Sequence, residues 1–153
     1  MKEFDYHEIP KVDEKQIYEL YDECMKWLPS KDFFIPFSQD DLDNMFNRDF
    51  GINIGAYDGK KLVGMATLYF DQDELKPMKE RLKVTNKKMC ELGNYLVAKD
   101  YRGQGIIKTL QDKLIELGKQ MKCNYVISTA HPENLGSVKT LLKELKIADT
   151  YEY

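Results

Sequence analysis

The stretch that decides the fold is Leu96-Val97-Ala98-Lys99-Asp100-Tyr101-Arg102-Gly103-Gln104-Gly105-Ile106-Ile107-Lys108. It joins an apolar run, typical of a buried strand, to an apolar repeat that is typical of a long amphipathic helix. The turn between them carries Gly103 and Gly105, which tolerate positive φ and let a ligand approach the backbone closely. The start of a helix also offers unpaired amides and the positive end of the helix dipole. Together these features predict a phosphate-binding loop.

Two common phosphate-binding motifs do not fit this loop. The Walker pattern GxxxxGK[ST] has no match in the chain. The dinucleotide pattern GxGxxG fails because Ile106, Ile107 and Lys108 follow Gly105 without a third glycine. The ligand class therefore has to come from the surrounding sequence.

The apolar periodicity on both sides of the loop predicts alternating strands and helices. Strands are expected over residues 4–9, 52–56, 62–70, 92–98 and 125–130. Helices are expected over residues 13–28, 38–46, 106–121 and 134–145. Asp58-Gly59 supplies the tight turn of a hairpin between the second and third strands. Neither a repeat nor a linker interrupts this order, so residues 1–153 are predicted to form one α/β domain.

The segment 71–90 is a long connection between the third and fourth expected strands. It is rich in charges of both signs, is broken by Pro77, and has room for a short helix around residues 78–82. Long connections in compact domains are often functional. A solvated insertion without a catalytic role is the equal alternative.

Composition and charge exclude several classes of protein. Apolar residues make up 42% and charged residues 32% of the chain, as in ordinary globular proteins. The formal net charge is −3 and the basic residues are scattered, whereas a non-specific nucleic-acid binder carries a basic patch. No stretch reaches membrane-spanning length, and no apolar signal segment opens the sequence. These features predict a soluble protein that binds neither nucleic acid nor membrane.

The three cysteines, Cys24, Cys90 and Cys123, are far apart in the sequence and form no CxxC pair. An odd number of cysteines without a signal segment favours reduced thiols and a cytoplasmic location. His7 and His131 do not complete a metal site with them. We therefore expect no bound metal.

The loop and its flanks resemble the acyl-CoA-binding motif of the GNAT acetyltransferase family, which reads roughly V-x-P-x-[YF]-R-G-x-G-[IL]-[GA]-x-x-L. The positions that match are Val97, Tyr101, Arg102, Gly103, Gly105, Ile106 and Leu110. The segment Thr129-Ala130-His131-Pro132-Glu133-Asn134 resembles the next region of that family, where an asparagine opens the last main helix. The resemblance covers the order of elements over nearly the whole chain and single residues from about 91 to 145.

This resemblance implies a mixed, splayed β-sheet with helices on both faces, in the order β-α-α-β-β-β-α-β-α-β. It also implies that the chain uses acetyl-CoA. The backbone amides of Gln104, Gly105 and Ile107, in the turn formed with Gly103 and Ile106, would then hold the CoA pyrophosphate.

Further cofactor contacts are implied on either side of that turn. Arg102 and Lys108 would add positive charge near the phosphates. The amides of Val97 and Ala98 would pair with the pantetheine arm and polarise the thioester carbonyl. Asn134 would reach the cofactor near the thiol.

The match departs from the family pattern at three places. Ile107 stands where Gly or Ala is usual, and it either crowds the pyrophosphate or packs into the helix interface. Leu141 stands where many members carry a tyrosine that protonates the leaving thiolate; Tyr151 and Tyr153 are possible substitutes. The family usually closes with two further strands, whereas the tail beyond 145 has room for one at most.

Glu91 is the first candidate for the general base, because it precedes the loop on the strand where some family members place a catalytic glutamate. A substrate ammonium must lose a proton before its nitrogen can attack, and a carboxylate can accept that proton. A solvated strand-end carboxylate is the alternative reading. Glu80 and Asp73 are weaker candidates, and His131 reads first as a turn residue beside a proline.

The sequence thus predicts an enzyme that moves an acetyl group from acetyl-CoA to a primary amine of a small molecule or peptide. The missing tyrosine and the short tail motivate an alternative, a non-catalytic acyl-CoA-binding sensor. Acyl transfer depends mainly on positioning and a base, which favours the enzyme. The acceptor remains open between a polyamine, an aminoglycoside, an amino acid and a protein amine.

A homodimer is predicted from the tail. A single strand over residues 147–153 would expose an unpaired edge with an aromatic face, and a two-fold pairing would satisfy both edges. We expect light scattering to find a dimer for the full chain and a monomer for a chain ending at Leu145. A monomeric full chain, or a dimer that survives the deletion, would contradict this prediction.

Overall fold

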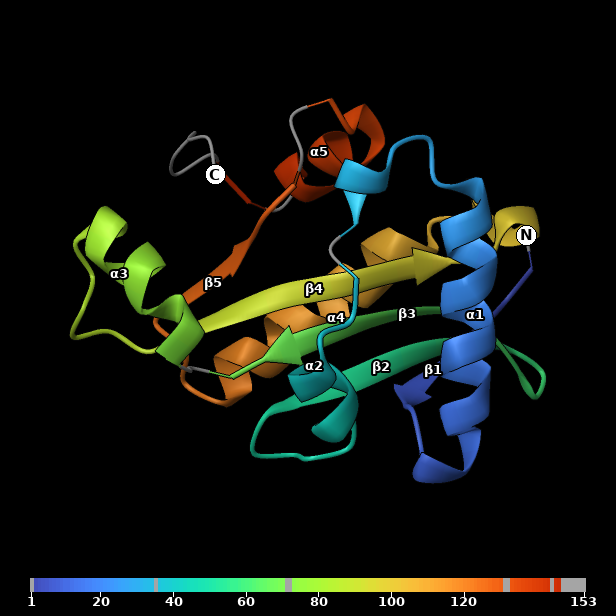
Figure 1. Ribbon diagram of the computed structural model, residues 1–153, viewed down its shortest axis with the longest axis horizontal. Coiled ribbons are helices and arrows are strands. Elements are labelled where there is room, and N and C mark those ends of the chain that lie inside the picture. Colours follow the sequence, from blue (N-terminus) through green and yellow to red (C-terminus); the bar gives the residue numbers. More distant parts are fainter. Residues whose placement is uncertain (1, 35, 71–72, 131–132, 144, 147–153) are drawn as a thin grey trace.

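The computed structural model describes residues 2–34, 36–70, 73–130, 133–143 and 145–146 (Figure 1). Its strands are β1 (Asp5–Glu8), β2 (Gly51–Asp58), β3 (Lys61–Tyr69), β4 (Met89–Val97) and β5 (Tyr125–Ser128). Its α-helices are α1 (Glu14–Trp27), α2 (Gln39–Asp43), α3 (Lys76–Leu82), α4 (Ile106–Gln120) and α5 (Leu135–Leu142). None of the helices within these ranges is both long and apolar enough to cross a membrane.

The sheet is mixed, as the sequence predicts. The strands lie in the order β1-β2-β3-β4-β5, and every neighbouring pair is antiparallel except β4 and β5, which are parallel. In Figure 1, α1 and α2 cover the near face of the sheet and α4 covers the far face. The expected α+β architecture with helices on both faces is therefore confirmed. The expected C-terminal strand over 147–153 lies outside the described residues.

The hairpin and the two long helices follow directly from local sequence. Gly59 turns β2 into β3 with a φ of 61°, the conformation for which a glycine was expected at this place. The apolar stripe of α1 buries Ile17, Leu20 and Cys24, and that of α4 buries Ile106, Leu110 and Leu114. The segment 71–90 contains α3, which confirms the short helix expected there, and α3 projects from the end of the sheet where β4 begins (Figure 1).

A buried polar layer lies between α2 and the sheet. The side-chain amide of Asn53 donates to the Met45 carbonyl at 2.7 Å and its oxygen accepts from the Thr67 hydroxyl at 2.6 Å. Asn94 in turn donates to Thr67 at 3.1 Å. Asn53 and Thr67 are only 6% and 3% exposed. Their hydrogen bonds replace those lost to water and so allow polar side chains in this part of the core.

The expectation of three reduced thiols is wrong for two of them. Cys90 and Cys123 form a disulfide, and only Cys24 is a free, buried thiol. The cause is the parallel pairing of β4 with β5, which begins at Met89 and Tyr125 and brings the two cysteines to a Cα–Cα distance of 6.3 Å. The disulfide removes the reduced-thiol argument for a cytoplasmic location.

We expect Thr67→Val to lower the free energy of unfolding by about 1–3 kcal/mol, because the buried Asn53 oxygen loses its donor while the side-chain volume barely changes. Urea denaturation would measure the change. Thr140→Val is the matched control: its hydroxyl bonds the Gly136 carbonyl at 2.9 Å in a more exposed place, and we expect a change within about 0.5 kcal/mol. An equal loss of unfolding free energy in the two variants would show that the buried hydrogen bond stabilises the fold no more than the exposed one.

Candidate active site

The glycine turn at the start of α4 presents a row of unpaired backbone amides. Gly103 and Gly105 have φ values of 77° and 78°. From Gly103 to Ile107, none of the amides finds an acceptor within the part of the chain that the structure describes. A Cβ at either glycine would meet no atom within 4 Å, so the backbone borders open space. Unpaired amides at the positive end of a helix suit an anion.

Two side chains fix this turn to the rest of the molecule. The Tyr101 hydroxyl donates to Asp58 at 2.6 Å and so ties the turn to the β2–β3 hairpin. The Arg102 Nε donates to the Val97 carbonyl at 3.3 Å, which folds the exposed guanidinium back toward the end of β4. The turn is therefore held at both ends before any ligand binds.

The two residues after Ile106 differ in what they can offer a phosphate. Ile107 is partly buried against the core, so its branched side chain packs inward, and this decides between the two alternatives left by the sequence. The Lys108 ammonium contacts both carboxylate oxygens of Asp112, at 2.6 and 2.7 Å. Part of the positive charge expected at Lys108 is thus neutralised within α4.

The amides of Val97 and Ala98 have different surroundings. The Ala98 N–H donates to the Val63 carbonyl at 2.8 Å and is engaged in the sheet. Hydrogen-bonded and non-hydrogen-bonded pairs alternate along an antiparallel ladder. Because Ala98 bonds to Val63, the next pair, Val97 with Gly64, is a non-hydrogen-bonded one, and the Val97 N–H points away from β3. Of the two expected strand contacts, the structure leaves the one at Val97 available to a ligand.

β4 and β5 separate into a fork. Their parallel pairing runs from Met89 and Tyr125 to Leu92 and Ser128 and then ends, and Figure 1 shows the two strands diverging from there. β4 also bulges at this point: against β3 the register shifts between Thr67 and Met65, where Asn94 takes a φ of 54°. The Val97 N–H therefore faces the open side of the fork.

Glu91 lies at the base of this fork, one pair before β4 and β5 separate. It pairs with Tyr69 of β3 and Ile127 of β5. Burial, and to a smaller extent the negative charge of Asp41, raise the pKa of the Glu91 carboxyl. No hydrogen bond or ion pair to Glu91 is made by any other described residue. A partly buried carboxyl group with a raised pKa is what a general base near neutral pH requires.

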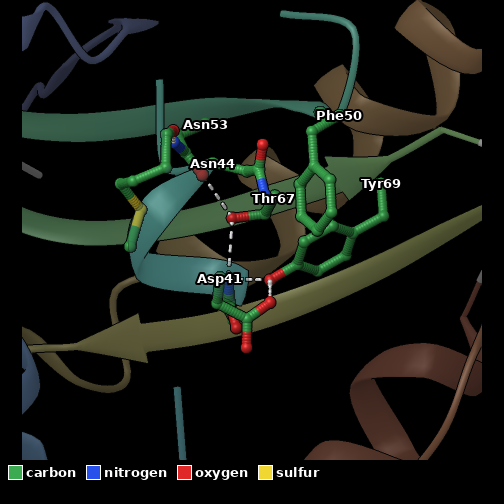
Figure 2. A pocket seen from close by; sticks show the side chains of 9 residues that line it. Asp41, Asn44, Phe50, Asn53, Thr67 and Tyr69 are labelled. Atoms are coloured by element: carbon green, nitrogen blue, oxygen red, sulfur yellow. Dashed lines mark hydrogen bonds between the residues drawn. The ribbon is translucent and has the colours of Figure 1, made fainter. Parts of the chain in front are cut away.

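A small polar pocket lies between α2 and the sheet, and Tyr69, the β3 partner of Glu91, is one of its lining residues (Figure 2). Its volume of about 10 Å³ matches a single water molecule. Its polar lining comes from Asp41, Asn44, Asn53, Thr67, Tyr69 and Asn94. Figure 2 shows the Tyr69 hydroxyl directed at Asp41, to which it donates at 3.4 Å, while Asn94 donates to the same hydroxyl.

The remaining expected residues have other surroundings. Asn134 caps α5, and its side-chain oxygen accepts from the Ser137 amide at 3.3 Å. Leu141 lies on α5 and is partly buried. Asp73 is exposed and pairs with Lys76 at 3.1 Å, which leaves it a weak base candidate. His131, Tyr151 and Tyr153 lie outside the described residues, and Glu80 is exposed on α3.

The sequence did not point to Asp41, Tyr69 or Asn94 as site residues. Asp41 lies in the first turn of α2, where it forms a capping box with Ser38. Tyr69 comes next to Glu91 only through the pairing of β3 with β4, and Asn94, at the bulge of β4, donates to the Tyr69 hydroxyl. An asparagine inside an apolar strand was the one local signal, because Asn tolerates positive φ better than most residues.

Comparison with protein families and known structures bears on the family and the fold of the chain. The family model described as "Acetyltransferase (GNAT) family" matches residues 15–145. No curated protein matches the chain significantly.

Several solved structures share the fold. A transcriptional regulator from Bacillus halodurans C-125 is 18% identical, with a TM-score of 0.72, over 99% of this chain and 98% of that one. A ribosomal-protein-alanine N-acetyltransferase from Brucella melitensis biovar Abortus 2308 is 19% identical, with a TM-score of 0.68, over 99% and 96%. An aminoglycoside N-acetyltransferase in complex with CoA is 15% identical, with a TM-score of 0.73, over 97% and 96%. At these identities the likeness concerns the fold alone.

If the turn holds CoA phosphates as the sequence predicts, Gly105→Val should weaken CoA binding at least about tenfold, because a side chain would strain the positive φ and obstruct the backbone. Arg102→Ala should cost less, about 1–3 kcal/mol for one charge-assisted contact. Calorimetry with CoA measures both. Gly59→Val is the control, since Gly59 shares the positive φ and the open space but opens no helix. Unchanged CoA affinity in Gly105→Val would refute the assignment.

Proposed function

Because this chain belongs to the GNAT family of acetyltransferases, we propose that it transfers an acetyl group from acetyl-CoA to a primary amine by direct attack, with Glu91 as general base. The observation that carries the proposal is spatial. The amides from Gly103 to Ile107 find no acceptor among the described residues, and they follow β4 along the chain. β4 itself carries the Val97 N–H and, at the fork, the partly buried carboxyl group of Glu91.

The turn fits the phosphates of CoA. Its amides lack acceptors within the described chain, its two positive-φ glycines border open space, and the Arg102 guanidinium is exposed beside it. Bound there, acetyl-CoA supplies the activated acyl group of the reaction. Gly103, Gln104, Gly105, Ile106 and Ile107 would hold the pyrophosphate through the backbone, with Arg102 adding charge.

The Val97 N–H would serve the reacting carbonyl. It is directed away from β3 on the open side of the fork. An amide held there donates to the carbonyl oxygen and stabilises the negative charge that grows on it during attack. Because β4 fixes this amide in the sheet, no reorganisation is needed when the charge develops.

Glu91 would prepare the nucleophile. An amine is protonated at neutral pH and has no lone pair for attack, so Glu91 accepts the proton directly or through a water. The raised pKa improves its match to this task, since a carboxylate of ordinary pKa is a weak base. Asp41, Tyr69 and Asn94 border the place where the amine would approach.

The acceptor is proposed as a primary amine of a small molecule or peptide. Two carboxylates, Asp41 and Glu91, interact in a region where no described lysine or arginine forms an ion pair with either. Such surroundings favour a cationic ammonium over a neutral or anionic substrate.

Glu91→Gln should keep CoA affinity but lower turnover about 100-fold, the usual effect of losing a general base. The parent rate should rise with pH through a pKa above the ordinary range of glutamate, and the variant should lack this limb. The assay couples acetyl-CoA to a panel of amines and follows thiol release. A variant within twofold of the parent would transfer the role to another group or to solvent, and CoA binding without turnover on any amine would favour the sensor.

Two controls separate the chemistry from folding. A carboxyl group whose pKa is raised by folding makes the protein less stable as the pH rises through the unfolded and then the folded pKa. Glu91→Gln removes this loss, so the variant should be at least as stable as the parent at neutral pH. Asp41→Asn removes a negative charge that raises the pKa of Glu91, so it should move the rate limb to lower pH.

A further inference from the structure

A disulfide lies at the closed end of the fork. Cys90 immediately precedes Glu91 in β4, and Cys123 lies in the turn between α4 and β5. Cys90 pairs with Val126 of β5, and the Cys123 N–H donates to the Gly118 carbonyl in the last turn of α4 at 3.0 Å. The disulfide therefore joins β4, α4 and β5 near the point from which the fork opens.

The same bond closes a covalent ring around the proposed site. Its two cysteines are 33 residues apart in the sequence. Between them lie Glu91, Val97 and the glycine turn from Gly103 to Ile107. The groups proposed to hold the acyl donor and to activate the amine thus belong to one cross-linked strand–turn–helix unit. A cross-link of this length restricts the unfolded chain strongly and so stabilises the unit.

Apart from the disulfide, β5 is attached by modest interactions. It pairs with β4 over four residue pairs, and none of its residues from Tyr125 to Ser128 is buried. The Asn124 N–H donates to the Lys88 carbonyl at 2.9 Å, and the Ser128 hydroxyl donates to the Leu92 carbonyl at 3.1 Å. The helix α5 has no buried residue either. Segments with little burial open locally at a low cost in free energy, so the loss of a covalent link should affect β5 first.

The two cysteines differ in their exposure. Cys90 is fully buried, whereas Cys123 is partly exposed in its turn, so an attacking thiol would reach Cys123 first. Lys88 and Met121 each lie two positions before one of the cysteines, and the Lys88 ammonium donates to the Met121 carbonyl at 3.0 Å. A positive charge is thereby kept in this region, where it stabilises the thiolates that form during thiol–disulfide exchange.

We propose that the Cys90–Cys123 disulfide is a reversible redox switch that sets the affinity of the chain for acetyl-CoA. The inference rests on the proposed function, in which the acyl donor lies at the fork beside the Val97 N–H. In the oxidised state the cross-link keeps β5 next to β4, and the fork is preorganised for its ligand. In the reduced state β5 separates from β4 more often, and the affinity falls with the fraction of molecules whose fork is formed.

The reductant is a dithiol, which supplies both electrons. One of its thiolates attacks the Cys123 sulfur, the sulfur–sulfur bond breaks, and Cys90 leaves as a thiolate that takes up a proton. The second thiolate of the reductant then attacks the mixed disulfide, closes the disulfide of the oxidised reductant, and releases Cys123, which also takes up a proton. Two electrons and two protons thus pass to the protein. Exchange with an oxidised thiol reverses the step.

The test compares one preparation of the full chain in two redox states. Alkylation in denaturant should find one free thiol before treatment with dithiothreitol and three after it. The reductant is then removed without air, and calorimetry measures the binding of acetyl-CoA, whose acylated sulfur does not exchange with the disulfide. We expect the reduced protein to bind at least about threefold more weakly. Re-oxidation with oxidised glutathione should restore the affinity.

Hydrogen exchange locates the structural change. Reduction should speed amide exchange in β5 more than in the hairpin of β2 and β3, because β5 loses a covalent attachment and the hairpin does not. Far-UV circular dichroism should be the same in both states, because the change is local.

Two cysteine variants complete the test. Cys123→Ser imitates the reduced state at a partly exposed position, so it should bind acetyl-CoA as the reduced parent does, with or without dithiothreitol. Cys24→Ser is the matched control. It keeps the disulfide, and its hydroxyl can replace the thiol that donates to the Val97 carbonyl at 3.4 Å, so it should keep the full response to reduction.

The outcomes separate this inference from the proposed function. Equal affinity for acetyl-CoA in the two redox states overturns the switch and leaves the proposed function standing. Three free thiols before reduction, unfolding of the whole reduced chain, or a response that is lost in Cys24→Ser also contradicts the inference. If the oxidised parent does not bind acetyl-CoA, the proposed function falls, and the inference falls with it.

Discussion

The separation of β4 from β5 after Leu92 and Ser128 is the constraint on which the site depends. A strand in the middle of a sheet pairs its backbone groups with two neighbours. Among the described strands, β4 beyond Leu92 pairs with β3 alone. That loss leaves the Val97 N–H unclaimed by a strand. The bulge at Asn94 allows the divergence, because an extra residue in one strand bends it and increases its local twist.

The glycine turn depends on the same strand. β4 ends at Val97, and the short 3-10 turn Lys99–Tyr101 then leads directly into the glycine turn. Contacts at both ends hold the turn in place: Tyr101 to Asp58 on the hairpin and Arg102 to the Val97 carbonyl. A turn fixed in this way loses little conformational freedom when an anion binds, which is the main benefit of a preorganised site.

Much of the fold could be predicted from the sequence, because its signals are local. Asp58-Gly59 specifies a turn, the stripe from Ile106 to Leu114 specifies a buried helix face, and the paired glycines specify the loop. The unexpected features all arise from pairing between strands. The Cys90–Cys123 disulfide and the contact of Tyr69 with Asn94 need the register of β4 against β3 and β5, which local periodicity does not contain. The catalytic role assigned to Glu91 remains a prediction.

Unfavourable terms of the fold occur at the fork, although not only there, since the buried Gln111 Oε1 of α4 also lacks a partner among the described residues. Glu91 is held where burial and a second carboxylate disfavour its charge, and the Tyr95 hydroxyl is buried without a partner. Elsewhere the described core satisfies most of its polar groups, as Asn53 and Thr67 show. A stable fold tolerates such groups most readily where a bound molecule relieves them, since a ligand that accepts a hydrogen bond or supplies a positive charge removes each penalty. Both groups therefore support the proposal that substrate binds at the fork, and they do so by an argument separate from that of the phosphate turn.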